Sequence, residues 1–170
     1  ASAAAPTTTH WIWQIGNGHN NNCRVRVRGT SGNRTTIRGS SGGGYFYSTD
    51  GTGPWLQAGL WDAEYTDFSY MGGASTDSIK PSCSGSTTFR LYRCTLDTCG
   101  KVDNTYNIGA DCTYQILETT FKNSLNSVCL RLNNTNTKTG GTRELYDNVF
   151  DEYVELFQAK DFKNRGNQFK

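Results

Sequence analysis

Hydrophobic and polar residues alternate along several short stretches of the chain, as they do in β-strands that bury one face. The alternation is strictest in residues 23–28, where arginine occupies every second position. Residues 34–38 resume the pattern after the turn-forming residues 29–33, so the two stretches predict a β-hairpin. Comparable short runs recur as far as about residue 132, without a helical pattern between them. This spacing predicts a mainly β protein with antiparallel sheets, either a β-sandwich or a barrel-like domain.

The last quarter of the chain has a different rhythm. After Gly140 and Gly141, apolar residues recur at the spacing of an α-helix, and acidic residues lie mostly between them. This pattern predicts one C-terminal amphipathic helix at about 142–159, packed on a sheet. We therefore expect a flexible leader at 1–9, a single β-rich domain at 10–163 and a polar tail at 164–170. No internal repeat is apparent.

Composition supports a β-rich domain and narrows the classes of function. Only 19% of residues are charged, and the chain contains 19 glycines, which suits short strands joined by tight turns. The net charge of +2 is too small to predict nucleic-acid binding. No apolar run approaches the ~20 residues that span a bilayer, so we expect no membrane insertion.

Six cysteines and the first residues predict a secreted protein. The even number of cysteines indicates three disulfides that staple the domain, with their pairing left open. Small residues at 1–5 resemble the surroundings of a signal-peptidase site, although a cloning boundary would look the same. Asn33 and Asn133 begin glycosylation sequons, as in an extracellular glycoprotein. Cysteine spacing does not fit a zinc site, so no metal or cofactor is predicted. The six cysteines are Cys23, Cys83, Cys94, Cys99, Cys112 and Cys129.

A stripe of arginines is the first candidate binding site. Arg24, Arg26 and Arg28 alternate and therefore share one face of a strand. Guanidinium groups on one face suit carboxylate, sulfate or phosphate ligands. The alternative is a solvated outer face whose arginines pair with the acidic C-terminal segment.

An aromatic and acidic segment is the second candidate. Trp55, Trp61 and Tyr65 could stack on sugar rings, while Asp62 and Glu64 would share a strand face and accept hydrogen bonds from hydroxyls. The two carboxylates could also bind calcium or cleave a glycosidic bond. The alternative is that the aromatic rings belong to the core.

A catalytic interpretation has weaker support. His10 and His19, together with Glu64 or Glu118, could provide the acid and base of a ribonuclease. Their spacing is not specific, and no nucleophile motif opens a helix, so no catalytic residue is assigned.

The sequence therefore favours a non-enzymatic recognition domain outside the cell. Such a domain could be an adhesin, a lectin-like carbohydrate-binding module, a secreted effector in host interaction or a virion-surface module. Its partner would be a glycan or a protein receptor. Two alternatives stay open, namely a small secreted hydrolase of glycans or RNA and a structural coat or wall component.

Overall fold

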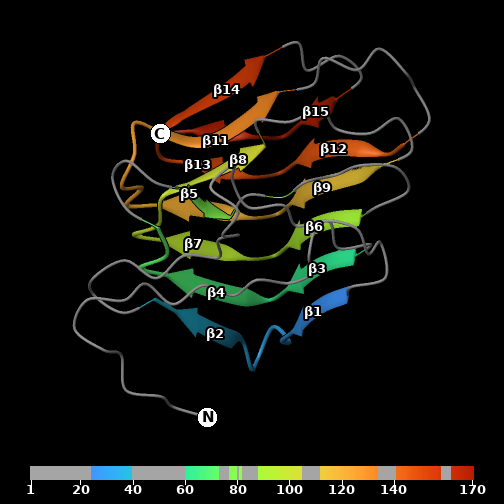
Figure 1. Cartoon of the computed structure of the whole chain (residues 1–170), viewed down its shortest axis with the longest axis vertical. Helices are drawn as coiled ribbons and strands as arrows, with labels where there is room; N and C mark the ends of the chain where they lie inside the picture. The colour runs from blue at the N-terminus through green and yellow to red at the C-terminus, as the bar shows by residue number, and fades with distance from the viewer. Residues whose placement is uncertain are drawn as a thin grey trace, which may run out of the picture.

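Every pairing between strands is parallel in the part of the chain that the structure describes. The computed structural model describes residues 24–39, 60–72, 77–79, 81, 88–104, 112–133, 141–157 and 162–170. Sixteen strands in these ranges form three sheets (Figure 1). Consecutive strands belong to different sheets, and each strand pairs with its equivalent in the next turn of the chain. The described part of the chain is therefore a three-sided β-solenoid.

The strands are grouped here by sheet. Sheet 1 contains, in spatial order, β1 (Arg24–Arg28), β3 (Leu60–Glu64), β6 (Thr88–Tyr92), β9 (Thr113–Leu117), β12 (Arg143–Tyr146) and β15 (Lys163–Arg165). Sheet 2 contains β2 (Thr35–Arg38), β4 (Thr66–Ser69), β7 (Thr95–Asp97), β10 (Thr120–Lys122), β13 (Val149–Phe150) and β16 (Gln168–Phe169). Sheet 3 contains β5 (Asp77–Ile79), β8 (Lys101–Asn104), β11 (Val128–Asn133) and β14 (Tyr153–Phe157).

Coils of unequal length explain why no repeat is visible in the sequence. Arg28 pairs with Glu64, 36 residues later, whereas Asn148 contacts Asn167 in the next coil, only 19 residues later. The strands nevertheless stay in register, although the number of residues between paired positions differs. A repeat of fixed period is the usual sequence signature of a solenoid, and this chain does not have one.

Side chains that point inward form columns along the axis of the solenoid. In sheet 2, Phe121 stacks on Phe150 with ring centroids 5.0 Å apart, and Phe150 stacks on Phe169 at 5.5 Å. In sheet 1, Phe89 packs against Tyr114 at 4.8 Å. Each coil thus buries the apolar face of its neighbour, which is the main source of stability in a repeat architecture.

A polar column lies inside the corner between sheets 1 and 2. The Thr119 amide donates to Oδ1 of Asn148 at 2.9 Å, and the Asn148 amide donates to Oδ1 of Asn167, also at 2.9 Å. Asn148 also donates through Nδ2 to the Ile116 carbonyl at 2.8 Å. These side chains satisfy backbone groups that the bend would otherwise leave buried without partners.

The antiparallel sandwich or barrel expected from the sequence is wrong. Residues 23–38 do not form a hairpin: β1 pairs with β3, and β2 pairs with β4, both in parallel. An isolated antiparallel bridge between Thr30 and Asn33 lies in the turn between β1 and β2 and belongs to neither strand. Alternation of apolar and polar residues with period two indicates that one face of a strand is buried. The same alternation occurs whether the neighbouring strand is parallel or antiparallel, so it does not predict the direction of pairing.

The predicted helix at 142–159 is also wrong, and no helix occurs in the described residues. This segment contains β12, β13 and β14, separated by short corners. Leu145, Asn148 and Phe150 all point inward and are buried. At each corner the alternation of inward and outward residues is interrupted and then resumes. Over the whole segment the apolar residues are therefore spaced about as they would be in an α-helix. Residues 164–170, expected to be a tail, include most of β15 and all of β16.

The expected disulfide staple is absent from the described residues. Cys94, Cys99 and Cys129 are buried free thiols and Cys112 is also buried, whereas Cys23 and Cys83 lie outside those residues. Cys94 and Cys99 lie on either side of the extended strand β7, and their thiols donate to different carbonyls, those of Tyr92 and Asp97. The distance from the Cys94 thiol to the Tyr92 carbonyl is 3.4 Å. The cysteines therefore serve as small residues of the core and its corners.

Two further expectations concern the leader and membrane insertion. The leader at 1–9 lies outside the described residues. Among the residues that are described, no helix is long and apolar enough to cross a membrane.

Candidate functional site

Two rows of side chains on the outward face of sheet 1 form the candidate site. They run across the strands, with neighbouring positions about 4.8 Å apart. The first row contains Arg26, Asp62, Arg90, Gln115, Glu144 and Lys163. The second contains Arg28, Glu64, Tyr92, Leu117, Tyr146 and Arg165. Hereafter these twelve positions are called the sheet 1 face.

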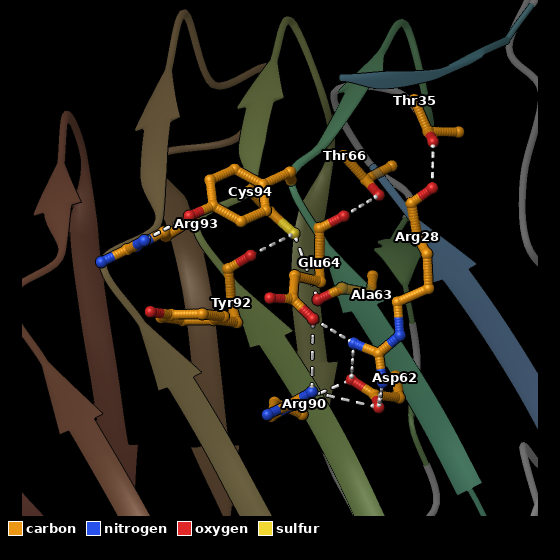
Figure 2. A network of polar contacts seen from close by, with 11 residues as sticks. Arg28, Thr35, Asp62, Ala63, Glu64, Thr66, Arg90, Tyr92, Arg93 and Cys94 are labelled. Atoms are coloured by element: carbon orange, nitrogen blue, oxygen red, sulfur yellow. Dashed lines mark hydrogen bonds and ion pairs between the residues drawn. The ribbon is translucent and has the colours of Figure 1, made fainter. Parts of the chain in front are cut away.

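Asp62 is held between two arginines at the start of this face (Figure 2). Arg90 donates from Nε to Oδ1 of Asp62 at 2.8 Å and from Nη2 to Oδ2 at 3.2 Å. Arg28 approaches from the neighbouring strand and donates to the same two oxygens. The Asp62 side chain is only 7% exposed, although it points away from the core. Both guanidinium groups are therefore fixed by a shared buried carboxylate.

Glu64 joins the same network one position further along β3. Arg28 donates to its Oε2 through Nη1, and Nη2 of Arg90 lies 3.8 Å from that oxygen. The hydrogen bond to Asp62 is the main reason that the pKa of Arg90 is raised above its usual value. Hydrogen bonds and ion pairs thus hold the Arg28 and Arg90 side chains in one arrangement before any ligand arrives.

Aromatic rings and a further arginine border the face at the corner after sheet 1. Arg93 donates from Nε to Oε2 of Glu118 at 2.8 Å and from Nη1 to the Tyr65 hydroxyl. Its guanidinium carbon lies 4.8 Å from the centre of the Tyr92 ring. The contact between Arg93 and Tyr92 is a cation–π interaction, so the guanidinium covers one face of that ring.

Three exposed cations at the two ends of the face have no ion pair within the described residues. Arg26 lies on β1, and Lys163 and Arg165 lie on β15 at the opposite edge. Arg165 stacks on the Tyr146 ring at 4.6 Å. Five strand spacings place the two ends roughly 24 Å apart. Within the described residues, the sheet 1 face holds five basic and three acidic side chains and so has a surplus of positive charge.

The outward faces of sheets 2 and 3 do not share this surplus. On sheet 3, Lys101 and Arg131 lie among three acids, and Nζ of Lys101 is 3.2 Å from Oδ2 of Asp103. Burial raises the pKa of Asp103, although both cations are close to it. On sheet 2, a hydrogen bond from Arg34 holds the pKa of Asp67 below its usual range. The sheet 3 cluster therefore has one more acidic than basic side chain, and on sheet 2 Arg34 and Asp67 neutralise each other.

The structure places the residues of the two candidate sites on neighbouring strands. Arg26 pairs with Asp62 and Arg28 with Glu64 in the β1–β3 ladder, so the arginine stripe and the acidic pair form one surface. Arg24 occupies the first position of β1. Trp61 points inward and is 1% exposed, so its ring belongs to the core. Tyr65 lies at the corner, half-buried, whereas Trp55, His10 and His19 lie outside the described residues.

Several residues of this face were not identified from the sequence. Arg90 and Tyr92 occupy the polar positions of an alternating stretch, whereas Lys163 and Arg165 lie in the polar run 163–165, which shows no such alternation. Alternation indicates that Arg90 and Tyr92 point outward. It does not show that they lie beside Asp62 or across the same sheet from Arg26, because that depends on which strands pair.

The acidic pair Asp62 and Glu64 forms ion pairs with arginines and is not arranged to bind a metal ion. Both oxygens of Asp62 already accept hydrogen bonds from Arg28 and Arg90. A calcium ion would have to displace guanidinium groups that neutralise the same carboxylate. No group of three or more histidine, cysteine or acidic side chains suited to a metal occurs in the described ranges.

Comparisons of this chain with protein-family models, with curated proteins and with solved structures find no match.

Proposed function

We propose that this protein is an extracellular recognition domain that binds a linear anionic glycan along the sheet 1 face. The observation that carries the proposal is the surplus of basic groups on this face: within the described residues, Arg26, Lys163 and Arg165 form no ion pair, and Arg28 and Arg90 are held in place by Asp62. Guanidinium groups form paired hydrogen bonds with carboxylate and sulfate groups, which are the charged groups of acidic polysaccharides. Immobilised arginines lose little side-chain entropy on binding.

An extended ligand fits this face better than a compact one. Arg26 and Lys163 lie on β1 and β15, the first and last strands of sheet 1 in the described part of the chain, so a single small anion could not contact both. A polymer that runs across the strands would meet successive side chains at the ladder spacing. The flat face of a parallel sheet offers the same geometry at each coil.

Asp62 and Glu64 do not act as the catalytic acids of a glycosidase in this proposal. A glycosidase needs one carboxyl group to donate a proton and a second to act as nucleophile or base. Here the guanidinium groups of Arg28 and Arg90 occupy both carboxylates. The acidic pair therefore supports the position of the arginines.

Binding of purified protein to heparin, to a polyuronate and to neutral dextran tests the proposal by calorimetry. We expect binding to the two anionic polymers only, and we expect it to weaken as salt rises because exposed charges are screened. Arg26→Glu should weaken this binding about tenfold or more. Arg38→Glu is the matched control, since it reverses one exposed charge on the outward face of sheet 2.

Three results would overturn the proposal. The first is equal binding to dextran, and the second is preferential binding to a nucleic acid of the same charge. The third is shortening of a polysaccharide or of RNA by the pure protein, which would indicate a hydrolase. An equal effect of Arg26→Glu and Arg38→Glu would place the binding surface elsewhere.

A further inference from the structure

The charged residues of the sheet 1 face are unevenly distributed across its strands. Its basic residues lie on β1, β6 and β15, whereas β9 and β12 contribute Gln115, Leu117, Glu144 and Tyr146. These two strands lie between β6 and β15 (Figure 1). We call these four described positions the central patch. Among them there is one acidic residue and no basic one.

Two polar side chains of the central patch present hydrogen-bonding groups that suit hydroxyls. Gln115 donates from Nε2 to Oε2 of Glu144 at 2.6 Å, and both side chains are half-buried. An amide has a second N–H and a carbonyl oxygen, and a carboxylate accepts several hydrogen bonds at once. The hydroxyl groups of an uncharged sugar both donate and accept, so this pair can bind them. The hydrogen bond between the two side chains also restrains both before a ligand arrives.

The other two side chains provide an apolar surface beside that pair. Leu117 and Tyr146 are partners on adjacent strands, and both are half-buried. Tyr92 continues this surface on β6. Binding sites for small polar molecules combine such apolar surfaces with a few polar groups that fix orientation. Here the C–H groups of a sugar ring would contact the apolar side chains, and its hydroxyls would contact the polar pair.

An anionic group over the central patch would be poorly placed. It would lie next to the Glu144 carboxylate, and like charges repel each other. Lys163 is the ladder partner of Glu144 and offsets this repulsion only on the side of β15. Arg90 and Lys163 are three strand spacings apart, roughly 14 Å. This separation leaves room for at least one whole sugar unit between two anionic units.

We propose that the glycan bound by this face carries its anionic groups on separated sugar units, with at least one uncharged sugar over the central patch. This inference rests on the proposed function, because it concerns the ligand of the same face. The anionic groups contact the arginines of β1 and β6 and the cations of β15. Glu144 is then the residue that distinguishes this ligand from a polymer that is charged on every sugar.

Two oligosaccharides with the same number of carboxylates test this inference by calorimetry with the full chain. In a hyaluronan oligosaccharide each uronate is followed by an uncharged N-acetylated sugar, whereas every sugar of an oligogalacturonate carries a carboxylate. We expect the wild-type protein to bind the hyaluronan oligosaccharide about tenfold more tightly. The oligogalacturonate has no uncharged sugar to place on the central patch, so it leaves Glu144 next to a like charge.

Substitutions at Glu144 separate this effect from the difference in ligand length. Glu144→Lys places a cation in the central patch and should reverse the preference, so that the oligogalacturonate binds more tightly. Glu144→Gln keeps the size of the side chain and should reduce the preference to about threefold or less. Glu152→Lys is the matched control, because it makes the same charge change at an exposed position just before β14 and should leave the preference unchanged. Circular dichroism checks that each variant keeps the wild-type fold.

The outcomes distinguish this inference from the proposed function on which it rests. Equal or tighter binding of the oligogalacturonate by the wild-type protein would overturn the inference and leave binding to an anionic glycan intact. An equal change of preference in Glu144→Lys and Glu152→Lys would also overturn it, since the response would then follow overall charge. Failure of both oligosaccharides to bind would overturn the proposed function itself.

Discussion

Seven described residues other than glycine have a positive φ, and all of them lie at corners of the coils. Tyr65, Arg93, Glu118 and Asp147 form the corner after sheet 1, with φ between 46° and 55°. The amide of each donates to a carbonyl of the next coil, as from Arg93 to Leu117 at 3.0 Å. This conformation is unfavourable for a residue with a side chain. Bonds along the axis compensate the unfavourable conformation, so the corners do not require glycine.

A close approach of two backbones does require glycine at position 141. A Cβ atom at Gly141 would lie 1.9 Å from the carbonyl oxygen of Cys112, whereas a Cβ at Gly32 would meet nothing within 4 Å. We expect Gly141→Ala to destabilise the protein by about 1–3 kcal/mol. Gly32→Ala should change stability by less than about 1 kcal/mol. Urea denaturation of both variants measures the difference, and equal stabilities would contradict the proposed contact.

At the scale of the element, each strand contributes one side chain to a column rather than to a local core. Phe150 illustrates this, because its ring stacks on Phe121 of the coil before and on Phe169 of the coil after. β13 contains only two residues and depends on these neighbours. Short strands of this kind are stabilised mainly by burial between coils.

Truncation of one ring in this column should therefore affect stability according to its position. We expect Phe150→Ala to cost about 3–5 kcal/mol, since the side chain is buried on both sides. Phe169→Ala should cost much less, because more than half of that side chain is already exposed. Thermal unfolding of the two variants measures both effects. A larger loss for Phe169→Ala would show that this end of the solenoid is covered in solution.

At the scale of the whole molecule, the reactivity of the buried cysteine thiols depends on whether the coils of the solenoid stay packed together. Burial raises the pKa of Cys94 and of Cys99 to about 11, and that of Cys129 to about 12. These thiols are protonated at neutral pH and have little access to solvent, so they are poor nucleophiles. Their reaction with a thiol reagent therefore requires that coils open.

Thiol counting tests this description without any substitution. We expect at least three cysteines to be unmodified in non-reducing intact mass spectrometry, namely Cys94, Cys99 and Cys129. At pH 8 they should react with a thiol reagent only as fast as the protein unfolds, and at once in denaturant. Three disulfides in the intact mass, or rapid labelling of these three residues in the native state, would contradict the structure.

The sequence by itself determined which residues of several strands point inward and which point outward. Alternation over residues 24–28 and 89–92 indicates a half-buried strand, because successive side chains point to opposite faces whatever the partner is. It therefore indicated that Arg26 and Arg28 share a face, and likewise Asp62 and Glu64. A mainly β composition followed from the same pattern.

Only the tertiary structure decided which strands meet. Parallel pairing of β1 with β3 depends on the stacking of whole coils, and no residue pattern within either strand encodes it. Corners changed the phase of the alternation at 142–159, so a local period was mistaken for a helix. The even number of cysteines predicted disulfides, but it could not show that β7 separates Cys94 from Cys99. Arg28, Asp62 and Arg90 meet for the same reason, because residues this far apart in the sequence come into contact only when the coils stack in register.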